Sequence, residues 1–333
     1  MPTLVFVHLN SQVPQYLLLN LHGMVKLFPE QKIVLIHNQA DLNHASPGVT
    51  LYKFESSSDF LQIENQLSHP KDFRNNFWFT AIGRFEALRD YMQETDEQII
   101  HVESDVILAK DFPFAKFQKL EIDIAFPLVA SNRGVASTLF LGNIEAAEKL
   151  VNFAIVESGN QPDITDMEIL AKIVHHPELK VLILPHAPAG RESFHKDIAG
   201  LNLELLAASL KYFGGLFDGN DIGVYLYGSN PRNQRGVSRI GQEIDGNFAA
   251  PSSWKFTFNA RRNFIQINSV SSALPIFSIH ATCKRKSLFW IYSRALVLRR
   301  IHKSQSSTIK VYPDVMTTMA LQKIGKFLPC GNK

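Results

Sequence analysis

Short apolar runs alternate with longer segments of helical periodicity along the first half of the chain. Residues 3–9 form an apolar run rich in β-branched and aromatic side chains, which predicts a strand. Residues 13–28 then carry apolar side chains three and four positions apart, including Leu17 and Leu21, which predicts a helix. A second strand is expected at residues 32–37. Because the connections are short, this strand–helix–strand unit predicts a parallel sheet and an α/β fold.

The same alternation continues along the chain and predicts one mainly parallel central sheet flanked by helices. Further strands are expected at residues 49–54, 98–102, 122–127, 135–141 and 180–184. Further helices are expected at residues 57–67, 77–92, 145–156 and 163–174. Turns are predicted at residues 111–114 and 132–134, and loops at residues 214–215, 218–220 and 228–241. Late strands are expected at residues 256–258, 264–267 and 275–279, and a helix at residues 288–301.

Two carboxylates follow the apolar run at residues 98–102. Glu103 and Asp105 are two positions apart, so in an extended segment their side chains point the same way. Open α/β sheets bind ligands beyond the carboxyl ends of their strands, and paired carboxylates repel unless a cation lies between them. Oxygen ligands suit Mn²⁺ or Mg²⁺, so the pair predicts a metal that bridges a diphosphate. The alternative is a surface turn after a buried strand, since so short a motif also occurs by chance.

Three further groups of residues are candidates for a functional site, and each can also be explained by a purely structural role. Arg84, within a predicted helix, can contact a phosphate or a sugar, or form a structural salt bridge. His280 follows a late apolar strand and can ligate a metal or be a hydrogen-bonded core residue. Asp163, Asp166 and Glu168 open a predicted helix, where a carboxylate can act as general base or cap the helix.

The order of these elements resembles the nucleotide-sugar-dependent glycosyltransferases of the GT-A fold. The resemblance rests on the opening βαβ units, the aromatic-rich helix, the strand that ends in Glu-Ser-Asp and the late strand that ends in Ile-His-Ala-Thr-Cys-Lys. It implies one GT-A domain at residues 1–285, with a donor part at about 1–142 and an acceptor part at about 143–285. A basic C-terminal helix and tail would follow at residues 286–333.

The resemblance also implies roles for individual residues. In the family a D-x-D-type motif and a late histidine bind Mn²⁺ or Mg²⁺ on the donor diphosphate, and a nearby lysine contacts the phosphates. The matching positions are Glu103, Asp105, His280 and Lys284. Asp105 is the expected direct ligand, because the second carboxylate of the motif is the usual one in the family. Glu103 stands where an aspartate is common and is expected to act directly, through water or on the ribose. Donor-binding positions are expected at Asn10, Arg84, Glu103, Ser104, Asn132, Arg133, Gly134 and Lys284.

The implied activity is transfer of a sugar from a nucleotide-diphosphate sugar to a glycan or lipid-linked acceptor. In an inverting enzyme Asp166 or Glu168 would deprotonate the acceptor hydroxyl, whereas a retaining enzyme needs no such base. The sequence leaves both outcomes open. The loop at residues 227–236 is dense in turn formers and is expected to form either a lid over the site or a plain surface loop.

Charge is unevenly distributed along the 333 residues. From residue 246 onward there are 14 Lys and Arg and one acidic residue, Asp314, so this part carries +13, whereas residues 1–245 carry −10. A basic C-terminal part suggests an anionic partner. Residues 286–303 combine aromatic and basic side chains, which favours weak peripheral contact with an anionic membrane, although their apolar positions also fit packing against the core.

The cysteines and the first residues of the chain indicate the cellular compartment in which the protein is expected. Cys283 and Cys330 form neither a disulfide framework nor a metal-binding spacing, so a reducing compartment is expected. The chain begins on a strand-like segment without a positively charged leader, and no segment approaches a transmembrane span. We therefore expect a cytoplasmic protein that can attach peripherally to the inner face of a membrane.

Other functions fit part of the pattern. A sugar nucleotidyltransferase shares the architecture but needs a glycine-rich basic loop after the first strand, where this chain has His8, Leu9, Asn10 and Ser11. A phosphatase with an aspartate nucleophile would place its acidic pair after the first strand. A nucleic-acid-binding module could use the basic C-terminal part but would leave the Glu-Ser-Asp motif unexplained, so no nucleic acid partner is expected.

Overall fold

The structure is a computed structural model of the chain. It describes residues 1–9, 12–42, 45–71, 73, 76–187, 203–227, 255–259, 264–268 and 273–281. The strands are β1 (Thr3–His8), β2 (Ile33–His37), β3 (Val49–Lys53), β4 (Ile99–Val102), β5 (Val106–Leu108), β6 (Ile124–Ala130), β7 (Arg133–Gly134), β8 (Thr138–Leu141), β9 (Val181–Leu184), β10 (Leu216–Phe217), β11 (Lys255–Asn259), β12 (Phe264–Asn268) and β13 (Ala273–His280). The helices are α1 (Gln15–Leu27), α2 (Ser58–Gln66), α3 (Phe77–Thr95), α4 (Phe114–Gln118), α5 (Ile144–Asn160), α6 (Asp166–Ile173), α7 (Leu203–Phe213) and α8 (Asp221–Tyr227).

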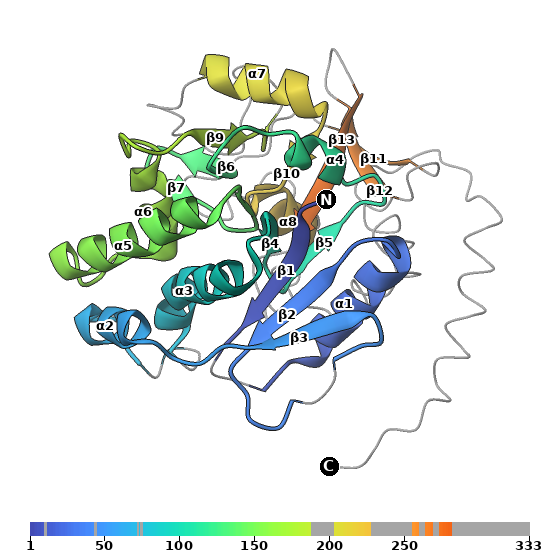
Figure 1. Ribbon diagram of the computed structural model, residues 1–333. Coiled ribbons are helices and arrows are strands. Elements are labelled where there is room, and N and C mark those ends of the chain that lie inside the picture. The colour runs from blue at the N-terminus through green and yellow to red at the C-terminus, as the bar shows by residue number, and fades with distance from the viewer. Residues whose placement is uncertain are drawn as a thin grey trace.

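The larger sheet has eight strands in the order β3-β2-β1-β4-β8-β6-β7, with β9 beside β6 (Figure 1). Strands β1 to β4 run parallel to their neighbours in the order β3-β2-β1-β4, and β9 is parallel to β6. The antiparallel pairs all involve β7 or β8. The predicted α/β fold, with a mainly parallel central sheet flanked by helices, is confirmed.

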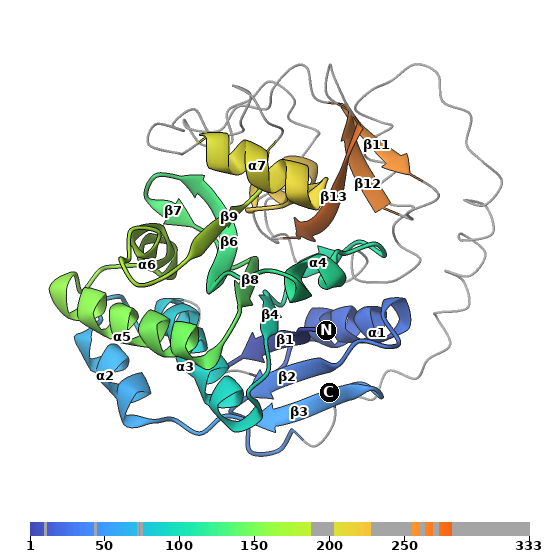
Figure 2. The same cartoon turned by 45° about the horizontal axis from the view of Figure 1, so that its top comes forward.

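Both faces of the larger sheet are covered, which explains why strands such as β2 and β6 are buried at every position. On one face lie α2, α3 and α5, which pack side chains such as Phe85, Leu88 and Leu150 into the core (Figure 2). Against the other face pack α1 and α4, with Leu17 and Phe117 among their buried residues. Strand β2 is buried at every position although it is the second strand from the β3 edge of the sheet.

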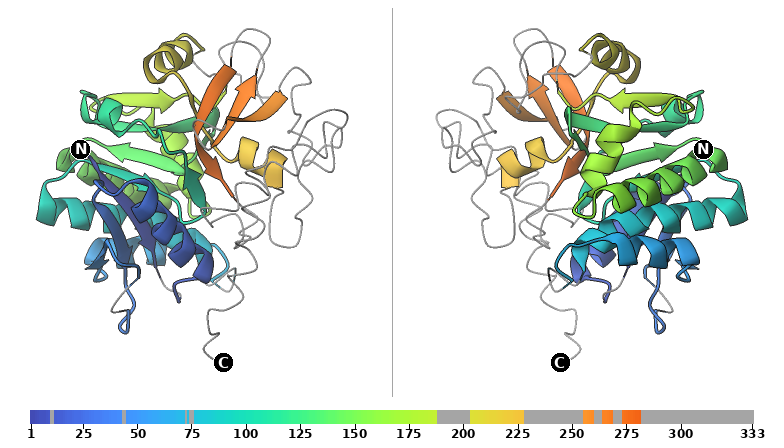
Figure 3. Two further views of the ribbon diagram at one scale, coloured as in Figure 1. Left: turned by 90° about the vertical axis from the view of Figure 1, so that its right-hand side faces the viewer. Right: turned by 90° about the vertical axis from the view of Figure 1, so that its left-hand side faces the viewer.

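A smaller sheet of five strands has the order β10-β13-β12-β11, with β5 beside β13. Its orange strands stand apart from the helices α2, α3 and α5, which are blue to green in Figure 3. Strands β4 and β5 follow each other in the chain but belong to different sheets. Only Glu103, Ser104 and Asp105 separate them, so the chain passes from one sheet to the other at this motif.

Some local expectations were wrong or incomplete. The expected turn at residues 111–114 leads directly into α4, and within the expected turn at residues 132–134 two residues pair with β6 as β7. Helices α7 and α8 and strand β10 were not predicted. In α7 the buried residues Leu206, Leu210 and Phe213 form a helical stripe, which the glycines and polar residues after it obscured.

Other expectations fall on residues that the structure does not describe. The loop at residues 228–241, the remainder of the expected lid after Tyr227, and all of residues 286–333 lie outside the described residues. None of the helices in the described ranges combines the length and the apolar character needed to cross a membrane.

Candidate metal centre

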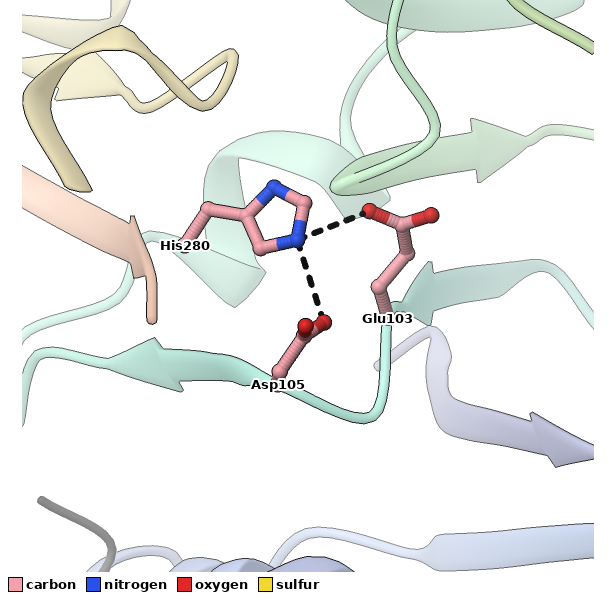
Figure 4. Close-up of side chains that lie close together, drawn as sticks. All are labelled: Glu103, Asp105 and His280. Carbon is pink, nitrogen blue, oxygen red and sulfur yellow. Dashed lines mark hydrogen bonds and ion pairs between the residues drawn. The ribbon is translucent and has the colours of Figure 1, made fainter. Parts of the chain in front are cut away.

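Three side chains from distant parts of the sequence converge where β4 ends. His280 Nε2 lies 3.1 Å from Asp105 Oδ1 and 3.4 Å from Glu103 Oε2 (Figure 4). The ligand atoms that these residues offer all lie within 4.8 Å of one another. Asp105 and His280 are buried, and Glu103 is partly exposed. The structure therefore brings together the three residues that the sequence predicted as metal ligands.

Strand pairing and one buried amide fix the geometry of this cluster. Strand β5 pairs antiparallel with β13, which places His280 opposite Val106, and the Ala281 N–H donates to the Asp105 carbonyl at 2.7 Å. From α1, Asn20 Nδ2 donates to the carbonyls of Ser104 at 3.2 Å and Val106 at 2.8 Å. Asn20 was not predicted as a site residue, although a polar residue within the apolar stripe of α1 is a signal that sequence can show.

Arg84 of α3 binds two carboxylates at once. Its Nη1 donates to Glu103 Oε1 at 2.5 Å and its Nη2 to Asp166 Oδ2 at 2.6 Å, while Nε donates to the Ala81 carbonyl at 2.6 Å. Burial lowers the pKa of Arg84, but the charges of Glu103 and Asp166 outweigh burial and raise it. The structural salt bridge considered as an alternative is thus present, and direct contact of Arg84 with the donor stays a prediction.

The charges of the cluster favour a cation at its centre. Burial by itself lowers the pKa of His280, but Asp105 and Glu103 outweigh it and raise the pKa to about 9. Burial raises the pKa of Glu103, yet Arg84 and His280 hold it below its ordinary value. Without a metal the imidazolium supplies the positive charge beside the carboxylates, and a divalent cation would take the place of the proton on Nε2.

The donor set itself can be tested for its fit to a divalent ion. Glu103 Oε2 is buried and, within the described residues, accepts no hydrogen bond, although it faces His280. A buried acceptor without a hydrogen bond is costly, and the ion pair with His280 Nε2 at 3.4 Å or a bound cation offsets this cost. Two carboxylates and one imidazole suit Mn²⁺, and an imidazole ligand suits Mg²⁺ less. The residues present fit a divalent cation.

The predicted catalytic carboxylates lie at the start of α6 and have different environments. Thr165 is the N-cap of α6, and its side chain accepts from the Glu168 N–H at 3.3 Å. Glu168 in turn accepts from the Thr165 N–H at 2.9 Å, which completes a capping box. Asp166 is buried against Arg84, and burial raises its pKa. Capping is thus performed by Thr165 and Glu168, and neither Asp163 nor Asp166 is the N-cap.

The predicted donor-binding residues lie in several places. Ser104 Oγ is 3.2 Å from the Tyr16 hydroxyl, beside the cluster. Asn132 is exposed, and Arg133 Nε donates to Met167 Sδ at 3.4 Å. Gly134 packs under α6, where an added Cβ would lie 2.6 Å from Leu170 Cβ. Asn10 and Lys284 lie outside the described residues.

Comparisons with known proteins give only distant structural likenesses. No family model matches the sequence, and no curated protein matches it either. The structure is similar to a galactosyltransferase, LgtC, in complex with donor and acceptor sugar analogues (10% identity, TM-score 0.39, covering 64% of this chain and 97% of that chain). It is also similar to mouse xyloside xylosyltransferase 1 (11% identity, TM-score 0.38, covering 55% of this chain and 84% of that chain). A third similar structure is PaToxG glycosyltransferase (12% identity, TM-score 0.37, covering 64% of this chain and 75% of that chain). At these identities and TM-scores the likeness is distant.

Proposed function

We propose that this chain is a metal-dependent glycosyltransferase that moves a sugar from a nucleotide-diphosphate sugar to a glycan or lipid-linked acceptor. The observation that supports this function is the cluster of Glu103, Asp105 and His280 beyond the carboxyl end of a parallel strand, in which the buried Glu103 Oε2 accepts no hydrogen bond from the described residues. That position is where open α/β sheets bind their ligands. The order of motifs that resembles GT-A enzymes supports the same function.

In this proposal Asp105 and His280 hold the cation and Glu103 is the third ligand. When bound, the cation neutralises the charge that develops on the diphosphate leaving group. Arg84 binds Glu103 Oε1 and so orients this carboxylate with its other oxygen toward His280. The short Arg84 contact also keeps Glu103 ionised, as a ligand must be. We expect Mn²⁺ to be preferred over Mg²⁺ because one ligand is an imidazole.

Asp166 is the better placed of the two proposed general bases. Arg84 donates to both Asp166 and Glu103, so only the Arg84 guanidinium separates Asp166 from a proposed metal ligand. Its raised pKa suits a group that takes a proton from an acceptor hydroxyl. Glu168 already accepts two hydrogen bonds from Thr165. If transfer proceeds with retention, neither residue is needed as a base.

Release of nucleotide diphosphate from a panel of nucleotide sugars tests the proposal. The full chain is assayed with Mn²⁺, with Mg²⁺ and with EDTA, and a thermal-shift screen of the same donors identifies which ones bind. We expect metal-dependent release that Asp105→Ala abolishes. Asp123→Asn is the matched control. Asp123 is a partly exposed carboxylate directly before β6, and it accepts from the Lys180 N–H before the neighbouring strand β9 rather than from a residue of the metal cluster. Equal release with EDTA, or parental release by Asp105→Ala, would refute the proposal.

A further inference from the structure

Asp218 is a buried carboxylate that binds three backbone N–H groups. It follows β10 and is 0% exposed. Its Oδ1 accepts from Ile222 N at 3.0 Å, and its Oδ2 accepts from Gly223 N at 2.7 Å and from His280 N at 2.9 Å. One carboxylate therefore fixes the first turn of α8 and the last residue of β13 at the same point.

The backbone of Asp218 ties this point to both sheets. Its N–H donates to the Ser278 carbonyl of β13 at 3.2 Å, and its carbonyl accepts from Ser137 Oγ at 2.6 Å, directly before β8 of the larger sheet. Beside it, the hydroxyls of Thr138 and Ser278 are 3.2 Å apart. Asp218 thus sits at a buried polar junction between the two sheets, next to the residue that supplies the nitrogen of the metal cluster.

Helix α8 touches the His280 backbone from the other side. A Cβ added to Gly223 would lie 1.7 Å from the His280 carbonyl oxygen, so only glycine permits this approach. The N–H of His280 is bound by Asp218 while its carbonyl lies against Gly223. The peptide groups on both sides of the His280 Cα are therefore held, which restricts where the imidazole can point.

We infer that Asp218 is a positioning residue that sets the affinity of the site for a divalent cation by fixing the His280 backbone. The inference rests on the proposed metal site and is independent of which donor or acceptor the protein uses. Asp218 is not itself assigned as a ligand, because both of its oxygens already accept backbone hydrogen bonds. Removing a residue that holds a metal ligand in place, without itself binding the metal, typically lowers metal affinity by 10- to 100-fold.

Asp218→Asn tests this role, because an amide offers only one acceptor atom and cannot satisfy both carboxylate positions. Mn²⁺ affinity of the full chain is measured from the free-ion EPR signal, and pulsed EPR reports the coupling of the bound ion to the imidazole nitrogen. We expect an affinity loss of about 10- to 100-fold and a weakened nitrogen coupling. His280→Ala sets the signal for complete loss of the nitrogen ligand.

Glu86→Gln is the matched control for general destabilisation. Glu86 is also 0% exposed and accepts from Ser57 Oγ, but it joins α3 to α2 and touches neither Asp218 nor His280 in the structure. This variant is expected to lower the melting temperature while Mn²⁺ affinity and nitrogen coupling stay at the parental values. Parental affinity and coupling in Asp218→Asn would overturn the inference.

A second variant covers the case in which Asp218→Asn does not fold. Gly223→Ala keeps the Asp218 side chain, but its Cβ would lie 1.7 Å from the His280 carbonyl oxygen and 2.9 Å from Asp218 Oδ2. It disturbs both contacts, so it is expected to weaken Mn²⁺ binding and nitrogen coupling as well. Parental affinity in that variant would also overturn the inference. If the parent chain binds no Mn²⁺, the proposed metal site and this inference fail together. If the parent binds Mn²⁺ but no donor reacts, only the proposed activity fails.

Discussion

His280 Nε2 lies 3.1 Å from Asp105 Oδ1, although 175 residues separate the two along the chain. The contact explains why the pKa of His280 rises to about 9 despite a burial that by itself would lower it. Without a metal, the imidazolium supplies the positive charge between the two carboxylates. A proton on Nε2 and a divalent cation therefore compete for the same nitrogen.

Mn²⁺ affinity is expected to increase with pH for this reason. Binding must release the proton of His280, so the apparent association constant should rise about tenfold per pH unit below the His280 pKa of about 9 and level off above it. Isothermal titration with Mn²⁺ at a series of pH values, in buffers with different ionisation enthalpies, measures both the affinity and the proton released. An affinity that is constant from pH 6.5 to 9 would contradict the assignment of His280 as a ligand.

The stability of the metal-free chain should show the opposite trend. The pKa of His280 is raised from 6.5 in the unfolded chain to about 9 in the folded chain, so its ion pairs contribute fully below pH 6.5 and are lost as the pH rises through about 9. The free energy of unfolding, measured by denaturant titration in EDTA, should therefore fall across this window. His280→Gln removes the titrating group, and its unfolding free energy should change less over the same range.

Two conservative variants distinguish the proposed bases from their structural roles. Glu168→Gln keeps a capping box, because glutamine can also accept from the Thr165 N–H, so stability should change by less than about 0.5 kcal/mol. Asp166→Asn keeps an acceptor for Arg84 but cannot take a proton. If Asp166 is the base, turnover should fall by about 10²- to 10⁴-fold in Asp166→Asn while Glu168→Gln stays near the parental rate.

The reverse pattern of turnover would assign the base to Glu168. Parental turnover in both variants would remove the general base from the mechanism and indicate retention. The anomeric configuration of the product, followed by NMR, provides the independent check.

Gly134→Ala should destabilise the protein by about 1–3 kcal/mol because the position is overpacked. The new Cβ would lie 2.6 Å from Leu170 Cβ and 2.8 Å from Phe126 Cε2, between β7 and α6. Gly159→Ala is the control, since its Cβ would meet only the flexible end of Gln66 and alanine is a better helix former than glycine. The free energy of unfolding, measured with denaturant, should be lower than the parental value in Gly134→Ala and equal to or higher than it in Gly159→Ala. Equal stability of the two variants would show that the packing at Gly134 is loose.

The basic segment at residues 286–303 is expected to give weak, salt-sensitive binding to anionic vesicles. Each cation near an anionic surface contributes about 1 kcal/mol, and salt screens this attraction. Co-sedimentation with phosphatidylserine vesicles at low and high salt measures the effect. Neutralising Arg299 and Arg300 should reduce binding, whereas no binding at low salt would remove the membrane from the list of partners.

Local sequence patterns predicted the parts of the fold and site that depend on neighbouring residues. The apolar run before Glu103 and Asp105 and the late strand before His280 were readable, because alternation and turn signals act over a few positions. The Thr165–Glu168 spacing is also a capping-box signature, although the helix start was expected at Asp163.

Long-range partners could not be predicted in the same way. Arg84 meets Asp166 from 82 positions away, and one residue type can satisfy many partners. Asp218 lies in an Asp-Gly-Asn segment whose composition indicates only a turn. Its role depends on backbone N–H groups of β13 and α8. Every residue except proline has such a group, so the sequence does not indicate which of them Asp218 binds.

The passage of the chain from one sheet to the other at Glu103 and Asp105 determines the order in which the site can be assembled. The carboxylates are in place once the segment from β4 to β5 forms, but the imidazole arrives only when β13 pairs with β5. Contacts between residues so distant in sequence require the closure of a long loop, which slows their formation. A nascent chain that ends before β13 therefore has the acidic pair without the imidazole, and its ligand set becomes complete only once β13 has been made and has paired with β5.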